Sequence, residues 1–303
     1  GIESDMKIGN PAKIKLRKER LAIMKEDMNS EVAIDIKYAS KYAQISNYYK
    51  YFIGQNKGLK RLNTVQIKRN DEAEFNDWAS DEKSQKYIHS KVLDKIKDSY
   101  EEINKYRKAQ TYMIEGAFAP EVIGFAYKFM RLYGILKKGN VSQAVIDPIK
   151  VDLIDASKEF FKDYNMPTDK KIFSSLMTMT YNEIDPLYYP SFFLKVQKKY
   201  KSSFSRYADD IYSKSIFRDS VPLNAFIEKP SLKTLEKDLG FITMRSVLNK
   251  YRELYMRTSK TKNNIKDHMR IYTEGLTKML PENKFYSDAN STMRLSYGKV
   301  IDY

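Results

Sequence analysis

Residues 34–52 read Ile34-Asp-Ile-Lys-Tyr38-Ala-Ser-Lys-Tyr42-Ala-Gln-Ile45-Ser-Asn47-Tyr-Tyr49-Lys-Tyr-Phe52. Large apolar side chains recur in this stretch at spacings of 4, 4, 3, 4 and 3 residues. Because an α-helix has about 3.6 residues per turn, this spacing places them all on one face of a helix. We therefore predict a helix from about Glu31 to Phe52, which Gly54 ends.

Residues that form turns are scarce along the whole chain. Gly and Pro together number 20 of the 303 residues, about half of the usual roughly 12%. A β-sandwich or barrel needs a turn every ~8–12 residues, so the composition argues against these classes. The 42% of hydrophobic residues argues against disorder. No run approaches the ~18 apolar residues of a membrane helix, so we expect no membrane span.

Helical periodicity continues on both sides of residues 34–52. The expected helices cover about 10–28, 62–78, 83–117, 120–138, 151–164, 168–178, 191–215, 241–257 and 264–280, and a further one starts after Ser231. Asn10-Pro11 is typical of a helix start, and Thr168 is a candidate cap of its helix. Pro222 and Pro230 mark a stretch that is rich in loops.

The pattern changes after Pro281. Residues 291–298 alternate apolar and polar side chains with a period of two, which predicts a β-strand. A lone strand at a chain end leaves both of its edges unpaired, so it should belong to a sheet outside this chain. The predicted fold class is thus all-α, with a multi-helix domain over 1–284. Residues 285–303 would begin a sheet outside this chain, which the family resemblance given below implies to be a β-barrel.

The formal net charge of +15 makes a nucleic acid or another polyanion a candidate partner. Basic and acidic residues alternate along the expected helices, however, as solvated helix faces do. The dense tracts 195–201 and 257–266 contain no glycine-rich or RNA-binding signature. A free-standing basic helical protein that binds a polyanion therefore stays an alternative, and so does a purely structural helical scaffold. No nucleic acid partner is expected under the leading hypothesis.

No catalytic centre is recognisable in the residues themselves. Cysteine is absent, and the two histidines, His89 and His268, both lie in helical pattern without a serine elbow of the Gly-x-Ser-x-Gly type. Asp209 and Asp210 are adjacent, so on a helix they point about 100° apart and form a charged face rather than an acid pair. No metal site or cofactor motif is expected, because ligands at metal spacing and a phosphate-binding glycine loop are lacking.

Several segments resemble a known enzyme family, the bacterial serine dipeptidyl-peptidases with a chymotrypsin-like double barrel and an inserted helical domain. The segment that carries the resemblance most specifically is Tyr286-Ser-Asp-Ala-Asn-Ser-Thr-Met-Arg-Leu-Ser-Tyr-Gly-Lys-Val300. Further similar segments are Asn10–Ile14, Leu21–Met24, Tyr38–Lys50, Ile53–Gly58, Tyr207–Asp209 and Ser215–Phe217, with Phe226 and Pro230. The resemblance extends over nearly the whole chain, which is similar to the helical domain of that family.

The resemblance implies that the catalytic residues lie outside this chain, in a barrel that precedes and follows the helical domain. The chain alone should then be inactive, and Gly1 is read as a tag remnant. The implied partners are the catalytic barrel of the same polypeptide, a peptide with a free N-terminus, and possible homodimerisation of the complete enzyme. The implied location is the periplasm or the cell surface, although no signal peptide is visible.

Asn47 is the one candidate site residue. At about 100° per residue, it lies roughly opposite the apolar face that contains Ile34. Its neighbours on that side, Ser40 and Ala43, are small. An exposed position or a tight helix contact would explain this pattern without any function. The resemblance implies instead that an asparagine of the helical domain binds the ammonium group of the substrate, with Asn47 the best match and Asn56, past the expected helix end, the weaker alternative.

Overall fold

The computed structural model describes residues 1–81, 89–285 and 298. Within these ranges the protein is all-α, which confirms the predicted fold class, and no strand occurs there. Almost all of the predicted strand at 291–298 lies outside the described residues. None of the described helices combines the length and the apolar character that crossing a bilayer requires.

The helices follow one another with short connections. The longer ones, of ten residues or more, are α2 (Asn10–Ser30), α3 (Val32–Arg61), α4 (Thr64–Asp81), α6 (Val92–Tyr112), α9 (Gln143–Lys162), α10 (Met166–Glu183), α11 (Ser191–Tyr200), α12 (Phe204–Lys214) and α15 (Leu239–Met279). The shorter ones are α1 (Ile2–Ser4), α7 (Glu121–Tyr127), α8 (Met130–Lys138), α13 (Ser220–Glu228) and α14 (Leu232–Lys237). π-helical turns cover Asp5–Gly9 and Met113–Ala117, and 3₁₀ turns cover Pro186–Tyr188 and Ile216–Arg218.

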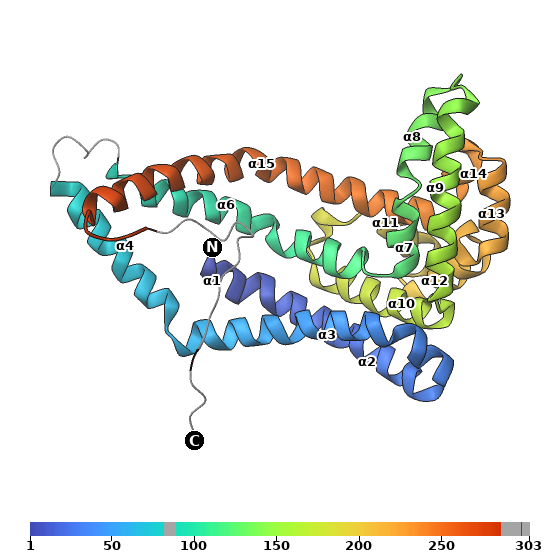
Figure 1. Ribbon diagram of the computed structural model, residues 1–303, viewed down its shortest axis with the longest axis horizontal. Helices are drawn as coiled ribbons and strands as arrows, with labels where there is room; N and C mark the ends of the chain where they lie inside the picture. Colours follow the sequence, from blue (N-terminus) through green and yellow to red (C-terminus); the bar gives the residue numbers. More distant parts are fainter. Residues whose placement is uncertain (82–88, 286–297, 299–303) are drawn as a thin grey trace.

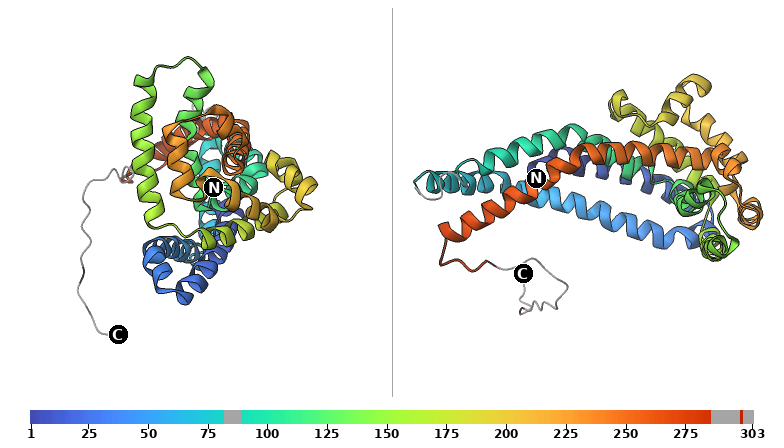
Figure 2. Two further views of the ribbon diagram at one scale, coloured as in Figure 1. Left: turned by 90° about the vertical axis from the view of Figure 1, so that its right-hand side faces the viewer. Right: turned by 90° about the horizontal axis from the view of Figure 1, so that it is seen from above.

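The molecule is elongated, and two long helix pairs run along it (Figures 1 and 2). At one edge α2 and α3 pack against each other as an antiparallel pair. At the other edge α15 lies beside α6. Helices α7 to α14 gather at one end, where α8 and α9 project from the body (Figure 1). Helix α4 closes the opposite end, next to the last turns of α15.

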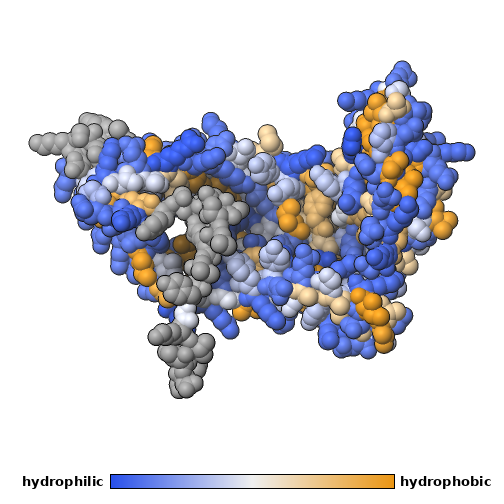
Figure 3. Space-filling model, in the orientation of Figure 1, coloured by the Kyte–Doolittle hydropathy of each residue, from blue (hydrophilic) through white to orange (hydrophobic). Residues whose placement is uncertain are grey.

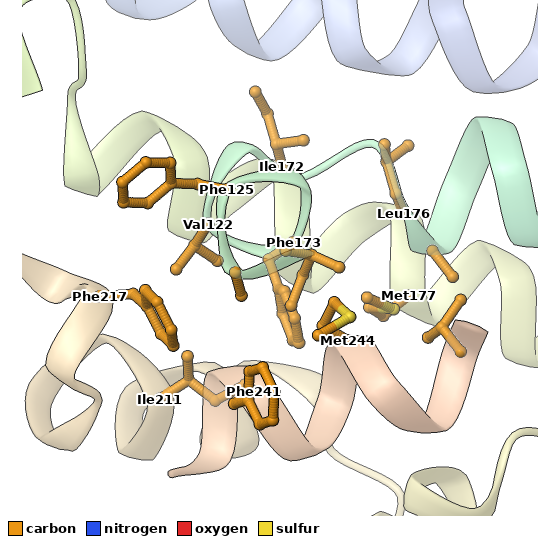
Figure 4. Packing of buried hydrophobic residues seen from close by; sticks show 14 of the residues in the cluster. Val122, Phe125, Ile172, Phe173, Leu176, Met177, Ile211, Phe217, Phe241 and Met244 are labelled. Atoms are coloured by element: carbon orange, nitrogen blue, oxygen red, sulfur yellow. The ribbon is translucent and has the colours of Figure 1, made fainter. Parts of the chain in front are cut away.

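A large hydrophobic core holds the wide end together. Phe173 and Met177 of α10 lie beside Met244 of α15, and Phe241 of α15 lies beside Ile211 of α12 (Figure 4). All of these side chains are completely buried. Each fully buried side chain of this size contributes roughly 1.5–3 kcal/mol of transfer free energy. This core therefore fixes how the helices at the wide end sit on α15.

A second, smaller cluster lies at the narrow end. Phe75 of α4 is fully buried there and packs against Trp78 and, edge to face, against Tyr272 of α15. A Cβ atom at Gly275 would come within 2.6 Å of the Phe75 ring. Only glycine allows α4 to approach α15 this closely, because a methyl group at that distance overlaps the ring.

Two predicted helix ends are wrong. Gly54 does not end the second helix, since α3 continues to Arg61. A glycine inside a helix costs only about 1 kcal/mol relative to alanine, which tertiary contacts along α3 offset. The two expected helices at 241–257 and 264–280 form one helix of 41 residues, α15. No Gly or Pro separates them in the sequence, and α6 supports α15 along its side.

Two other expected helices are each divided in two. The expected helix at 191–215 is broken between α11 and α12, where Lys201 and Ser202 adopt positive φ values of 51° and 60°. The expected helix after Pro120 is broken between α7 and α8. The predicted cap Thr168 is also wrong, because the side chain of Asn165 caps α10 by accepting from the Thr168 amide at 3.0 Å.

Candidate functional site

Asn47 lies on the solvent-exposed face of α3. The opposite face carries the buried side chains of Ile34, Tyr38 and Ile45, which pack in the large core. The amide of Asn47 makes no hydrogen bond to any described residue, so both its oxygen and its nitrogen are free for a ligand or another part of the protein. The predicted orientation of Asn47, away from the core, is confirmed.

The surroundings of Asn47 leave room for an approaching group. Ser40 and Ala43, which precede it on the same side of the helix, are exposed as well. Gly54, two turns further along α3, has no heavy atom within 4 Å of the place where a Cβ would stand. The side of α3 around Asn47 is therefore exposed, and Ser40, Ala43 and Gly54 place little side-chain bulk beside its amide.

Asn56, the weaker candidate, has a different position. It lies inside α3 rather than past its end, and its Oδ1 accepts a hydrogen bond of 2.9 Å from the Nδ2 of Asn10. Asn10 is 1% exposed, and the Nδ2 of Asn56 also donates to the carbonyl of Met6 at 3.5 Å. The amide of Asn56 thus tethers the N-terminal segment to α3, so the structure favours Asn47 over Asn56 as the free group.

A polar network attaches α3 to the start of α7. The Tyr38 hydroxyl donates to Glu121 at 2.6 Å, and the Lys41 ammonium binds the other carboxylate oxygen of Glu121 at 2.5 Å. Lys41 also donates to the carbonyl of Asp163 at 2.5 Å. Burial and the adjacent Glu121 raise the pKa of the Tyr38 hydroxyl, which stays protonated as a donor. These contacts therefore fix α3 at Tyr38 and Lys41, less than three helical turns from Asn47.

Asp169 of α10 is the centre of this network and is completely buried. It accepts hydrogen bonds from the backbone amides of Glu121 and Val122, at 2.6 and 2.9 Å, and from the hydroxyls of Tyr164 and Tyr212, at 3.3 and 2.8 Å. Burial raises the pKa of Asp169 to about 6, Glu121 adds to this, and the two amides and Tyr212 oppose it. No pattern in the sequence singles out Asp169. The expected helix start at Pro120 indicates only that the first backbone amides of that helix need an acceptor.

The two histidines lie apart from Asn47 and differ in environment. His89 is completely buried in the small cluster, with its ring 5.6 Å from that of Trp78 and 6.3 Å from that of Phe75. Neither of its ring nitrogens has a hydrogen-bond partner among the described residues. His268 of α15 is half-buried, and its Nδ1 contacts the backbone carbonyl of Asn264. Among the described residues, neither histidine is hydrogen-bonded to a serine or to a carboxylate as a general base would be.

We expect protonation of His89 to destabilise the protein as the pH falls below about 6.5. Burial lowers the pKa of His89, the nearby Lys278 lowers it further, and Glu274 opposes both. The unfolded chain therefore takes up the proton first, at up to about 1.4 kcal/mol per pH unit for one group. Melting temperatures between pH 7 and pH 5 should fall less for His89→Leu than for the unchanged protein. His268→Leu is the control, and an equal fall in all three proteins would contradict this role.

Charged residues elsewhere form ordinary surface pairs. Asp209 binds Lys170 at 2.6 Å, and Asp210 binds Lys214 at 2.6 Å, so the two adjacent carboxylates point to different partners as expected. The face that Figure 3 displays is mostly hydrophilic, with hydrophobic side chains along α8 and α9 and near the α2–α3 turn. Among the described residues, no three His, Asp or Glu side chains lie close enough together to hold a metal ion.

Comparison with known families gives one match over the whole chain. The family model described as Peptidase S46 matches residues 1–303. The chain belongs to the peptidase S46 family. Its relatives include an Asp/Glu-specific dipeptidyl-peptidase of Flavobacterium psychrophilum, 32% identical over 300 residues, and dipeptidyl-peptidase 7 of Porphyromonas gingivalis, 30% identical over 309 residues. The alignments cover 97% and 100% of this chain but 41% and 42% of those proteins.

Solved structures agree with this S46 assignment at the level of the fold. The crystal structure of Porphyromonas endodontalis DPP11 in complex with the dipeptide Arg-Glu matches with a TM-score of 0.75 and 22% identity. The match covers 92% of this S46 chain and 39% of that protein. A second structure of DPP11, in complex with substrate, matches with a TM-score of 0.70. The chain thus spans about two fifths of the length of these relatives.

Proposed function

We propose that this S46 chain is the helical, cleft-covering part of a serine dipeptidyl-peptidase, which releases dipeptides from the N-termini of peptides. In this proposal the catalytic residues belong to other parts of the polypeptide. The observation that carries it is the match of the whole chain to about two fifths of proteins named dipeptidyl-peptidase.

The role proposed for Asn47 is to bind the ammonium group at the substrate N-terminus. This is supported by its free amide on an open face of α3 and by the contrasting engagement of Asn56. A peptide α-amino group has a pKa near ~8, so at neutral pH it is mostly a cation that needs acceptors. The Asn47 carbonyl oxygen offers one without adding a charge. The proposed location is the periplasm or the cell surface, and a homodimer of the complete enzyme is part of the proposal.

Peptidase assays on two proteins test the proposed function. We expect the complete polypeptide to release a chromophore from dipeptidyl substrates and to leave the same substrates intact when their N-terminus is acetylated. The 303-residue chain alone should release none above buffer, because in this proposal the nucleophile that forms the covalent intermediate belongs to another part of the polypeptide. Activity of the isolated chain, or equal cleavage of free and acetylated substrates by the complete protein, would contradict the proposal.

A further inference from the structure

A cavity of about 270 Å³ lies between α2 and the segment that joins α6 to α7. Its charged lining consists of Arg17 and Arg20 from α2 and of Glu115 from the π-helical turn, and Leu16, Ile114 and Phe118 contribute apolar walls. Two guanidinium groups face one carboxylate here, so the lining carries a net charge of +1 from these residues. None of them belongs to the open face around Asn47.

Arg17 is held in a defined position beside this cavity. One of its terminal nitrogens binds Glu115 at 2.7 Å, and its guanidinium group lies over the rings of Tyr48 and Phe52, 5.3 and 5.6 Å from their centroids. Its Nε is buried and has no hydrogen-bond partner among the described residues. An arginine that is fixed on both sides loses little further side-chain entropy when it binds a ligand.

Arg20 lacks even the single carboxylate partner that Arg17 has. No hydrogen bond or ion pair joins its guanidinium group to another described residue, and its Nε is buried. Burial lowers the pKa of Arg20, while Glu121 and Asp169 oppose this from a distance. Both of these carboxylates are already occupied by direct partners. The guanidinium group of Arg20 thus has no anionic partner among the described residues, so this position gains from an added acceptor.

We propose that Arg17 and Arg20 form a binding site for one carboxylate group. The planar fork of a guanidinium group matches the two oxygens of a carboxylate, and the apolar walls can contact the aliphatic part of the ligand. The volume accommodates a carboxylate with a short aliphatic part and a few waters, each of about 30 Å³. The carboxylate comes either from a free small acid or from a peptide. The site does not depend on the role of Asn47.

Melting of the 303-residue chain in sodium acetate, compared with sodium chloride at equal ionic strength and pH 7, tests this site. At ten times the dissociation constant, we expect acetate to raise the melting temperature by about 2 °C or more. The variant Arg20→Gln should lose this rise. Lys18→Gln is the matched control, because Lys18 is an exposed cation on the same helix and should leave the rise intact.

A second measurement does not depend on the folding of any variant. Acetate should shift the Nε–Hε resonance of Arg20 in the nuclear magnetic resonance spectrum of the unchanged protein. Equal melting in acetate and chloride, an unmoved Arg20 resonance, or an undiminished rise in a folded Arg20→Gln variant would each overturn the proposal. The source of the carboxylate is tested with the tripeptide Ala-Ala-Ala, and its C-terminal amide, which has no carboxylate, is the control. A larger shift of the Arg20 resonance with the free tripeptide than with acetate indicates a peptide carboxylate. An equal shift indicates a small free acid.

Discussion

The variant Asn47→Ala is expected to lower kcat/KM for dipeptidyl substrates about 10- to 150-fold in the complete enzyme. This range corresponds to the roughly 1.5–3 kcal/mol that a hydrogen bond to a charged group contributes. The fall in kcat/KM should be the same whichever residue precedes the cleaved bond of the substrate, because the ammonium group is common to all substrates. Folding should be unaffected, since Asn47 is exposed and makes no hydrogen bond to the described residues.

Two control variants separate binding of the ammonium group from general effects on α3. Gln44 is exposed on the same helix, and Gln44→Ala should leave kcat/KM within about twofold. Asn56→Ala removes one of the two acceptors of the Asn10 amide, the other being Gln55, and should lower thermal stability rather than kcat/KM. An unchanged kcat/KM in a folded Asn47→Ala enzyme would show that another group binds the substrate N-terminus.

The second large effect is expected at Asp169. Replacing it by alanine should lower the free energy of unfolding by roughly 3–5 kcal/mol, because its donors would stay buried without an acceptor. These donors are the backbone amides of Glu121 and Val122 and the hydroxyls of Tyr164 and Tyr212. Urea unfolding of the 303-residue chain, followed by circular dichroism, measures the change.

An aspartate at the surface provides the comparison for Asp169→Ala. Asp209 pairs with Lys170 of another helix, but its side chain is 58% exposed. Asp209→Ala should therefore change the free energy of unfolding by less than about 1 kcal/mol. If the two variants unfolded at the same urea concentration, Asp169 would not hold α7 and α10 together as its hydrogen bonds indicate.

The sequence predicted the fold class because the helical period is a local property. The apolar face of α3 is visible in residues 34–52, and the structure places Ile34, Tyr38 and Ile45 of that face in the core. Helix ends were less predictable, because neighbouring helices decide them. Gly54 is compatible with a helix end, but α3 continues past it, where Asn56 bonds to Asn10.

The candidate site was predictable only in part. The orientation of Asn47 follows from the helical period alone, and the structure agrees with it. The residues around the buried carboxylate were not predictable, because Asp169 and Glu121 are far apart in the sequence and meet only through the packing of α10 against α7. The same holds for Arg20, whose position beside the α6–α7 segment has no signature in its own neighbourhood.

Helix α15 contributes residues to both hydrophobic clusters and so joins them. Thr258 is its last buried residue on the side of the large core, and Gly275 is its next one, in the small cluster. Bending of α15 between these two residues therefore disturbs no buried side chain of its own. Along this edge the two clusters are therefore joined by the continuous helix α15 and its side-by-side contact with α6, rather than by fully buried side chains of α15 between them.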